Sequence, residues 1–139
     1  IRFCDWSSDV CSSDLAIVDT NFPADSVARE TAFGELLRID NVTAARAVRA
    51  VLSVLPLDTL QPSVGRMEVI GAPDEIPPIQ QEVQTEIDRA EGRPAPMYGI
   101  ERFAFYEAAK TAYCVIQTGE TRFYGNFLLT KGIIPPATE

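Results

Sequence analysis

The sequence predicts an α/β fold with a largely parallel sheet. Short apolar runs alternate with helical patterns along the chain, and the first runs end at polar residues. The length of 139 residues is that of one domain, and 46% hydrophobic residues are enough for an ordinary hydrophobic core. No internal repeat follows residue 16, and no linker is long enough to separate two domains.

The strands are predicted from apolar runs that turn-forming residues interrupt. In order, they are residues 16–18, 36–39, 67–70, 113–116 and 127–129. The first ends at Asp19, a position where open α/β sheets place their ligand crevices.

Three helices are predicted between these strands, at residues 43–55, 79–90 and 102–111. Each has apolar residues three or four positions apart on one face. Pro56 ends the first helix, and Gly92 lies just beyond the second.

The composition excludes several classes of function. A net charge of −8 and a pI of about 4.5 argue against nucleic acid or an anionic membrane as partner. No apolar run approaches the roughly 20 residues that span a bilayer. The glycines form no phosphate-binding motif. Neutral small molecules therefore remain as ligands.

The three cysteines, Cys4, Cys11 and Cys114, suggest neither a disulfide framework nor a metal site. A cytoplasmic location is expected for such a chain. The chain contains no histidine, so the usual carrier of protons near neutral pH is missing.

Residues 1–15 differ from the rest of the chain. They repeat Ser-Ser-Asp at 7–9 and 12–14 and lack helical or strand periodicity. The tract resembles a translated sequencing adapter, although a disordered native tail would have a similar composition. We expect residues 1–15 to be a non-native tail and residues 16–139 to be a domain truncated at its amino end.

Four polar residues are candidates for binding a polyol, and each also has an ordinary structural explanation. Arg102 offers a rigid fork of donors, or it pairs on the surface with a neighbouring glutamate. Tyr124 can donate, accept or stack, or it is a half-buried strand tyrosine. Asn126 can donate and accept hydrogen bonds to a polyol, or it caps its own turn. Asp19 either binds the polyol or forms a turn.

Five motifs, taken in order, resemble the L-fucose mutarotase and D-ribose pyranase family. They are Val-Asp-Thr-Asn-Phe-Pro at 18–23, Ser-Val-Leu-Pro-Leu-Asp-Thr at 53–59, Glu-Arg-Phe-Ala-Phe-Tyr-Glu at 101–107, Thr-Gly-Glu at 118–120 and Tyr-Gly-Asn at 124–126. The resemblance covers residues 16–134 and favours the fucose branch. It implies a three-layer α/β fold and symmetric homo-oligomers, often rings of ten.

The resemblance also implies an activity: interconversion of the α and β anomers of L-fucose or a related monosaccharide, without a cofactor or a metal. The matching substrate-binding residues would be Asp19, Arg102, Tyr124 and Asn126, with Met67 and Tyr106 as pocket lining. D-ribose pyranase activity and non-catalytic monosaccharide binding are the alternatives. An unrelated α/β domain, in which Tyr-Gly-Asn is only a turn, is a third.

The chain departs from this family at one catalytic position. The family carries a histidine, within Gly-His-Gly-Asp, about eight residues before the aspartate that matches Asp19. That count leads to Cys11, within the tract of residues 1–15. Tyr124 remains as a candidate catalytic residue, and impaired activity is expected.

Overall fold

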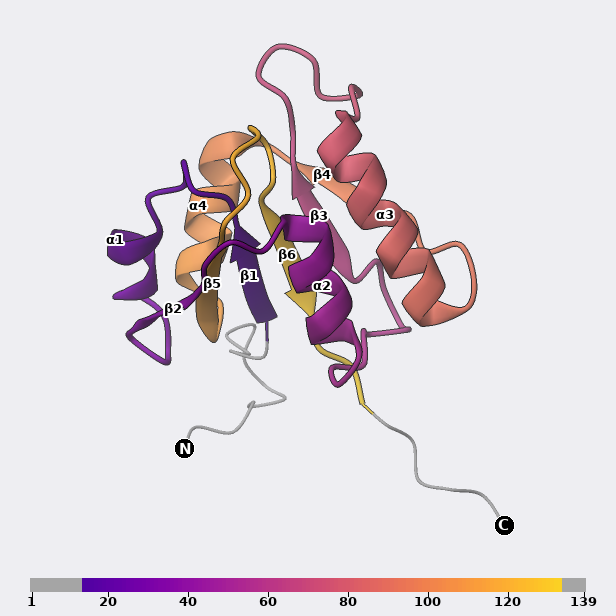
Figure 1. Ribbon diagram of the computed structural model, residues 1–139, viewed down its shortest axis with the longest axis horizontal. Coiled ribbons are helices and arrows are strands. Elements are labelled where there is room, and N and C mark those ends of the chain that lie inside the picture. The colour runs from indigo at the N-terminus through magenta and orange to yellow at the C-terminus, as the bar shows by residue number, and fades with distance from the viewer. Residues whose placement is uncertain (1–13, 134–139) are drawn as a thin grey trace.

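The computed structural model describes residues 14–133 and arranges them in three layers, with a sheet between two layers of helices (Figure 1). Within this range there are six strands and four helices. The strands are β1 (Asp14–Val18), β2 (Leu36–Ile39), β3 (Val64–Met67), β4 (Tyr98–Ile100), β5 (Cys114–Thr118) and β6 (Phe127–Thr130). The helices are α1 (Ala24–Ala28), α2 (Ala44–Leu52), α3 (Pro78–Glu91) and α4 (Arg102–Lys110).

The strand order in the sheet is β2-β5-β1-β6-β3-β4. Strands β2, β5 and β1 are parallel, and so are β3 and β4. Only β6 is antiparallel to its neighbours, β1 and β3, within the described part of the chain. The prediction of a largely parallel sheet is confirmed. Because β6 is reversed, its amino end lies at the edge where β1 and β3 have their carboxyl ends.

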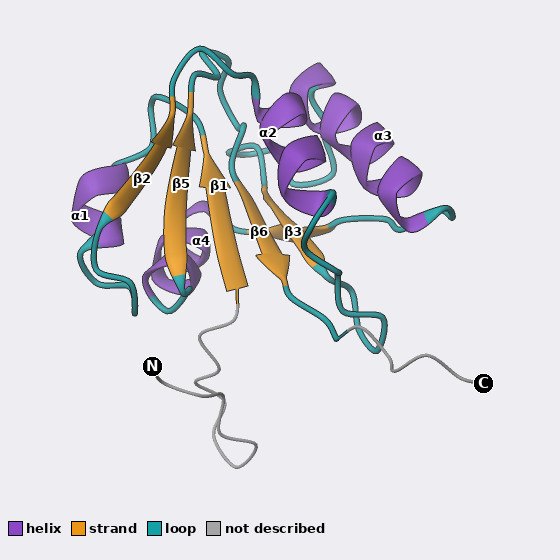
Figure 2. Cartoon of the chain, turned by 60° about the horizontal axis from the view of Figure 1, so that its bottom comes forward, coloured by secondary structure: helices purple, strands orange, loops and turns teal. Residues whose placement is uncertain are grey.

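The two faces of the sheet bury separate apolar cores. Successive side chains of a strand point to opposite faces. Ile17 of β1 therefore packs with Val48 of α2 and Val83 of α3, whereas Val18 packs with Phe105 of α4. Figure 2 shows α2 and α3 on one side of the sheet and α1 and α4 on the other. The three-layer arrangement implied by the resemblance is confirmed.

Local signals determine where the helices begin and end. Thr43 caps α2 by accepting a hydrogen bond from the backbone N–H of Arg46 at 3.3 Å. Gly92, with φ of 69°, ends α3 in the left-handed region that glycine favours. Glu101 caps α4 by accepting from the backbone N–H of Phe103 at 2.9 Å.

The third strand differs from the prediction. It lies at Val64–Met67 rather than 67–70. Its sequence contains Gly65 and Arg66, which interrupt the apolar run, yet Arg66 is only 7% exposed. Backbone carbonyls satisfy the guanidinium of Arg66, so the strand can be buried without being apolar.

Other boundaries also differ. α2 ends at Leu52, three residues before its predicted end. α1 and β4 are absent from the predicted elements because five and three residues are too few for periodicity to show. β1 begins at Asp14, so the last two residues of the tract set aside above pair within the sheet.

Residues 1–13 of that tract, including Cys4 and Cys11, lie outside the described residues. Among residues 14–133, no helix has the length and apolar composition needed to cross a membrane.

Candidate functional site

A cavity of about 370 Å³ opens at the edge of the sheet where β1 and β3 end, β6 begins and α4 starts. Six of its lining residues are those that the sequence singles out, although they are up to 107 positions apart in the chain. The lining consists of Asp19, Asn21, Phe22, Met67, Ile70, Arg102, Tyr106, Phe123, Tyr124 and Asn126. The antiparallel direction of β6 explains the meeting, because it brings the residues before β6 to the residues after β1.

Asp19 and Asn126 hold each other in place at the floor of this cavity. The backbone N–H of Asp19 donates to Asn126 Oδ1 at 3.0 Å. Asp19 Oδ2 accepts from the backbone N–H of Gly125 at 3.1 Å, and Oδ1 accepts from that of Asn21 at 3.0 Å. Asn126 Nδ2 lies 3.6 Å from the sulfur of Met67. Asn126 is thus not a turn residue bonded to its own backbone, and its side chain joins β6 to the end of β1.

Burial raises the pKa of Asp19 above its ordinary value of 3.8. The backbone N–H groups of Gly125 and Asn21 counteract this in part, and the nearby Glu120 carboxylate adds to the rise. Asp19 is 2% exposed, so it is a desolvated carboxyl group beside a cavity. Such a group can accept hydrogen bonds from a polar ligand and can exchange a proton more readily than a surface aspartate.

Arg102 is the first residue of α4 and extends along the wall of the cavity. Its Nε donates to Tyr106 Oη at 3.2 Å, and its guanidinium lies 5.2 Å from the ring centroid of Phe103. Among the ion pairs of the described residues, none involves Arg102, so surface pairing with a neighbouring glutamate does not explain its position. The aromatic contacts hold the planar fork in place beside the cavity.

Tyr124 lies in the loop before β6 rather than in a strand, and its φ of 65° is rare for a bulky residue. Its hydroxyl accepts from the backbone N–H of Ile70 at 3.3 Å. Its carbonyl accepts from Gln80 Nε2 at 3.1 Å. Both ends of the residue are therefore attached to the loop that follows β3 and to the start of α3.

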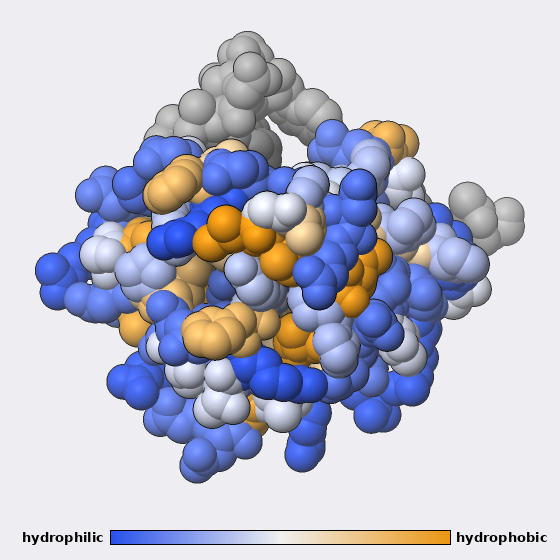
Figure 3. Space-filling model, turned by 90° about the horizontal axis from the view of Figure 1, so that it is seen from above, coloured by the Kyte–Doolittle hydropathy of each residue, from blue (hydrophilic) through white to orange (hydrophobic). Residues whose placement is uncertain are grey.

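Four lining residues are not among the predicted site residues: Asn21, Phe22, Ile70 and Phe123. Asn21 and Phe22 lie two and three residues after Asp19, so their position in the same turn was the available signal. Phe103 is 65% exposed beside Arg102. Figure 3 views this end of the molecule and shows hydrophobic residues gathered among hydrophilic ones.

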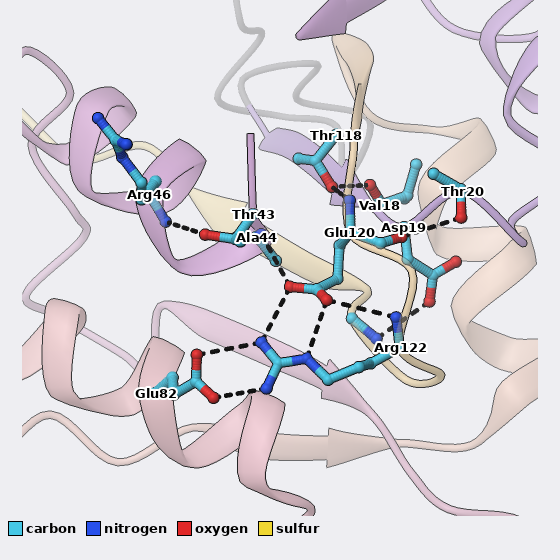
Figure 4. Close-up of polar contacts among 11 residues, drawn as sticks. Val18, Asp19, Thr20, Thr43, Ala44, Arg46, Glu82, Thr118, Glu120 and Arg122 are labelled. Atoms are coloured by element: carbon cyan, nitrogen blue, oxygen red, sulfur yellow. Dashed lines mark hydrogen bonds and ion pairs between the residues drawn. The ribbon is translucent and has the colours of Figure 1, made fainter. Parts of the chain in front are cut away.

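A buried carboxylate supports the turn that carries Asp19 (Figure 4). Glu120 is 3% exposed and accepts from the backbone N–H of Ala44 at 3.2 Å and from Arg122 Nε at 2.9 Å. Arg122 also pairs with Glu82 of α3. The backbone carbonyl of Glu120 accepts from both the N–H and the hydroxyl of Thr20, at 2.9 and 3.0 Å. Glu120 thereby joins the turn after β1 to α2 and, through Arg122, to α3.

The charge state of Glu120 follows from these bonds. Burial alone would raise the pKa of Glu120, but the hydrogen bonds from Arg122 and Ala44 outweigh it and lower the pKa below its ordinary value of 4.5. Glu120 is therefore a charged structural carboxylate, and its pKa is shifted in the opposite direction from that of Asp19 beside it.

Among residues 14–133, no group of three or more His, Cys, Asp or Glu residues is arranged to hold a metal ion. The polar groups around the cavity are instead amide, carboxyl, guanidinium and hydroxyl groups, interleaved with aromatic rings. That set suits a neutral ligand with several hydroxyl groups.

Comparison with known proteins agrees with this geometry. The profile of the family described as RbsD / FucU transport protein matches residues 12–134. The chain belongs to the RbsD / FucU family. Fucose mutarotase from Danio rerio is 37% identical over 127 residues, covering 88% of this chain and 80% of the relative.

Solved structures also match the fold. The crystal structure of the protein Atu2016 is 74% identical, with a TM-score of 0.88, covering 89% of this chain and 83% of that protein. The fucose mutarotase from Streptococcus pneumoniae, solved in complex with L-fucose, is 30% identical, with a TM-score of 0.77. That match covers 89% of this chain and 85% of that protein.

Proposed function

We propose that this chain is a sugar mutarotase, an isomerase that interconverts the α and β anomers of L-fucose. The observation that carries the proposal is the convergence of Asp19, Arg102, Tyr124 and Asn126 on one cavity of about 370 Å³. Relatives that carry the name fucose mutarotase, one of them solved with L-fucose, support the choice of sugar.

The chemistry of the cavity suits a pyranose. Arg102 supplies donors, Asp19 supplies acceptors, and Asn126 has both kinds of atom. Tyr106 and Phe22, whose ring centroids are 5.3 Å apart, offer an aromatic surface for the C–H face of the sugar. In this proposal Met67 completes the floor.

Mutarotation needs one group that removes the proton of the anomeric hydroxyl and one that protonates the ring oxygen. The ring then opens to an aldehyde, the carbonyl carbon rotates, and closure reverses the two proton transfers. Arg102 and Asn126 would orient the sugar and stabilise the open carbonyl form. Asp19, Tyr106 and Tyr124 contribute the carboxyl and phenol groups of the cavity lining, and of these we propose Asp19 and Tyr124 as the proton carriers.

The absence of histidine leads us to propose that this chain is an impaired catalyst. Loss of a general acid–base group typically costs about 10²–10⁴-fold in rate. The test is NMR magnetisation exchange between the α and β anomeric protons of L-fucose, with D-ribose in parallel. A matched chain, in which a Gly-His-Gly-Asp segment replaces residues 1–13, should accelerate L-fucose exchange. Background exchange in both chains would contradict mutarotase activity.

Non-catalytic monosaccharide binding is the second candidate, and the missing histidine is the observation that favours it. It predicts saturable L-fucose binding without anomer exchange, even in the chain that carries the histidine segment. D-ribose pyranase activity predicts the reverse preference between the two sugars in the same assay.

We further propose that the protein is cytoplasmic and forms a homo-oligomer, as a ring of ten in the arrangement that the resemblance implies. Large exposed apolar side chains around the cavity, Phe103 at 65% and Phe123 at 71%, are consistent with a covered surface. Light scattering after size exclusion tests the assembly, because ten copies have ten times the 15.3 kDa of one chain.

A further inference from the structure

A fully buried amide lies behind Tyr124. Gln80, in the first turn of α3, has no exposed surface, yet it is outside the cavity lining. Its Nε2 donates to the carbonyl of Met67 at 2.8 Å and to that of Tyr124 at 3.1 Å. Its Oε1 accepts from Arg66 Nη1 at 3.3 Å. The nitrogen and the oxygen of this amide are thus both hydrogen-bonded to residues outside α3.

Arg66 determines which way the amide of Gln80 points. A guanidinium is only a donor, so the oxygen of Gln80 must face it and the NH₂ group must face the two carbonyls. The other partners of Arg66 are the carbonyls of Pro73 at 3.0 Å and Glu75 at 3.4 Å. No ion pair of the described residues involves Arg66. This nearly buried cation therefore orients Gln80 and anchors the loop after β3.

The peptide unit between Tyr124 and Gly125 is held from both sides. Gln80 binds its carbonyl, and Asp19 Oδ2 accepts from its N–H at 3.1 Å. This unit follows a left-handed tyrosine, a strained conformation that persists only where surrounding contacts maintain it. Removing one of the two contacts should therefore let Tyr124 leave that conformation.

We propose that Gln80, oriented by Arg66, is a positioning residue that holds Tyr124 in the left-handed conformation in which it lines the cavity. Its functional consequence rests on the proposed sugar binding. Tyr124 relaxed to an ordinary φ would turn its ring and its hydroxyl away from Ile70, so the cavity would lose part of its wall.

The variant Gln80→Glu tests this role with almost no change in shape. The new carboxylate satisfies Arg66 but places an oxygen against the carbonyl oxygens of Met67 and Tyr124. We expect the Kd for L-fucose to rise about tenfold or more, by NMR titration. We also expect faster hydrogen exchange at the Gly125 amide, while the new ion pair with Arg66 keeps the melting temperature close to that of the parent.

Gln81→Glu is the matched control, because it makes the same chemical change one residue further along α3 at an exposed position, where the amide donates to the carbonyl of Ile76 at 2.9 Å and makes no hydrogen bond to Tyr124 or Arg66. It should leave both the Kd and the Gly125 exchange rate unchanged. Gln80→Met removes both donors without adding a charge and should repeat the effect on Gly125. It is used in place of Gln80→Glu if that variant does not fold.

The two readouts separate this inference from the proposed function. If the parent chain binds no sugar, the proposed function fails, and the exchange rate at Gly125 still decides the role of Gln80. Unchanged Gly125 exchange in both Gln80 variants would overturn the inference whatever the sugar result. Faster exchange at the Gly125 amide with an unchanged Kd for L-fucose would also overturn the inference. Sugar binding would then not depend on Gln80 holding Tyr124 in place.

Discussion

At the scale of single residues, the cavity depends on side chains that are fixed before any ligand arrives. Arg102 is held by Tyr106 and by the face of Phe103, and Asn126 is held by the backbone of Asp19. Such fixed groups lose little conformational entropy on binding. The proposed site therefore consists of preorganised donors and acceptors.

Arg102 provides the first prediction at this scale. Arg102→Lys keeps the charge but removes the planar fork and the Nε–H that donates to Tyr106. We expect the affinity for L-fucose to fall about tenfold, from the loss of one to two charge-assisted hydrogen bonds. Isothermal titration measures the change. Arg49→Lys, on the exposed side of α2, is the control and should bind as the parent does. Equal affinities for the Arg102 and Arg49 variants would remove Arg102 from the proposed site.

Gly125 provides a second prediction, because its backbone passes close to the buried carboxyl side chains of Asp19 and Glu120. A Cβ added there would lie 3.0 Å from Glu120 Cγ and 3.3 Å from Asp19 Cβ. We expect Gly125→Ala to lower the free energy of unfolding by about 1–3 kcal/mol through overpacking, as measured by urea unfolding. Gly34→Ala does not serve as a control, since its φ of 79° adds strain of its own. Ser26→Ala, exposed on α1, does, and its unfolding curve should match the parent's.

The sequence pointed to residues that line the cavity better than to the residues that support them. Asp19, Arg102, Tyr124 and Asn126 have functional groups suited to a sugar, and each lies in a motif that a reader of the sequence can find. Gln80, Arg66 and Glu120 act through backbone atoms that only the fold brings near them. No periodicity or spacing encodes such contacts, so the supporting roles of these residues were missed, even that of Glu120, which lies in the Thr-Gly-Glu motif at 118–120.

At the scale of elements, Glu120 connects parts of the chain that the sheet alone does not connect. Its carboxylate receives the N–H of Ala44, one of the groups that a helix start leaves without an intrahelical partner. Through Arg122 it also reaches Glu82 of α3. The positions of α2 and α3 relative to the loop that carries Glu120 therefore depend on a charged Glu120, and the backbone carbonyl of Glu120 in turn holds the Asp19 turn.

The lowered pKa of Glu120 makes this contribution depend on pH. Because the folded-state pKa lies below the ordinary value of 4.5, the unfolded chain takes up the proton first as the pH falls. The stabilisation is complete above about pH 4.5 and is lost as the pH falls through the folded-state pKa.

Glu120→Gln should lower the free energy of unfolding at neutral pH by about 1–3 kcal/mol, because Ala44 and Arg122 lose a charged acceptor. It should also flatten the decline in stability below pH 4.5, seen by urea unfolding at a series of pH values. Glu107→Gln removes an exposed partner of Lys110 and should change stability by less than about 0.5 kcal/mol. If the stability of Glu120→Gln declined below pH 4.5 as steeply as that of the parent, the role given to the Glu120 carboxylate would be contradicted.

Strand prediction succeeded where burial and apolarity coincide and failed where they do not. Ile17 and Leu128 belong to uninterrupted apolar runs, and their strands were found. β3 contains a buried Arg66 and a glycine, so no apolar run marks its true position in the sequence. β4 has three residues, too few to show a pattern of their own. It is a strand because it pairs with β3.

At the scale of the whole molecule, the net charge of −8 surrounds a cavity whose one basic lining residue is Arg102. Glu68 and Glu101 line an adjoining cavity that shares Arg102 and Ile70 with the first. Charges more than about 10 Å away are largely screened at about 0.1 M salt, so the long-range field matters mainly at low ionic strength. A neutral sugar should not sense this field, whereas an anionic sugar should.

This balance between a local cation and a distributed negative charge predicts how the protein discriminates among sugars. L-fucose should bind with the same Kd at low and high sodium chloride. L-fucose 1-phosphate should bind about tenfold more weakly at low salt, and its disadvantage should shrink as salt screens the repulsion. Titration of both sugars across a salt series measures this. Tighter binding of the phosphate at low salt would mean that Arg102 outweighs the net charge, and an anionic sugar would then replace the neutral one as the ligand best matched to the cavity.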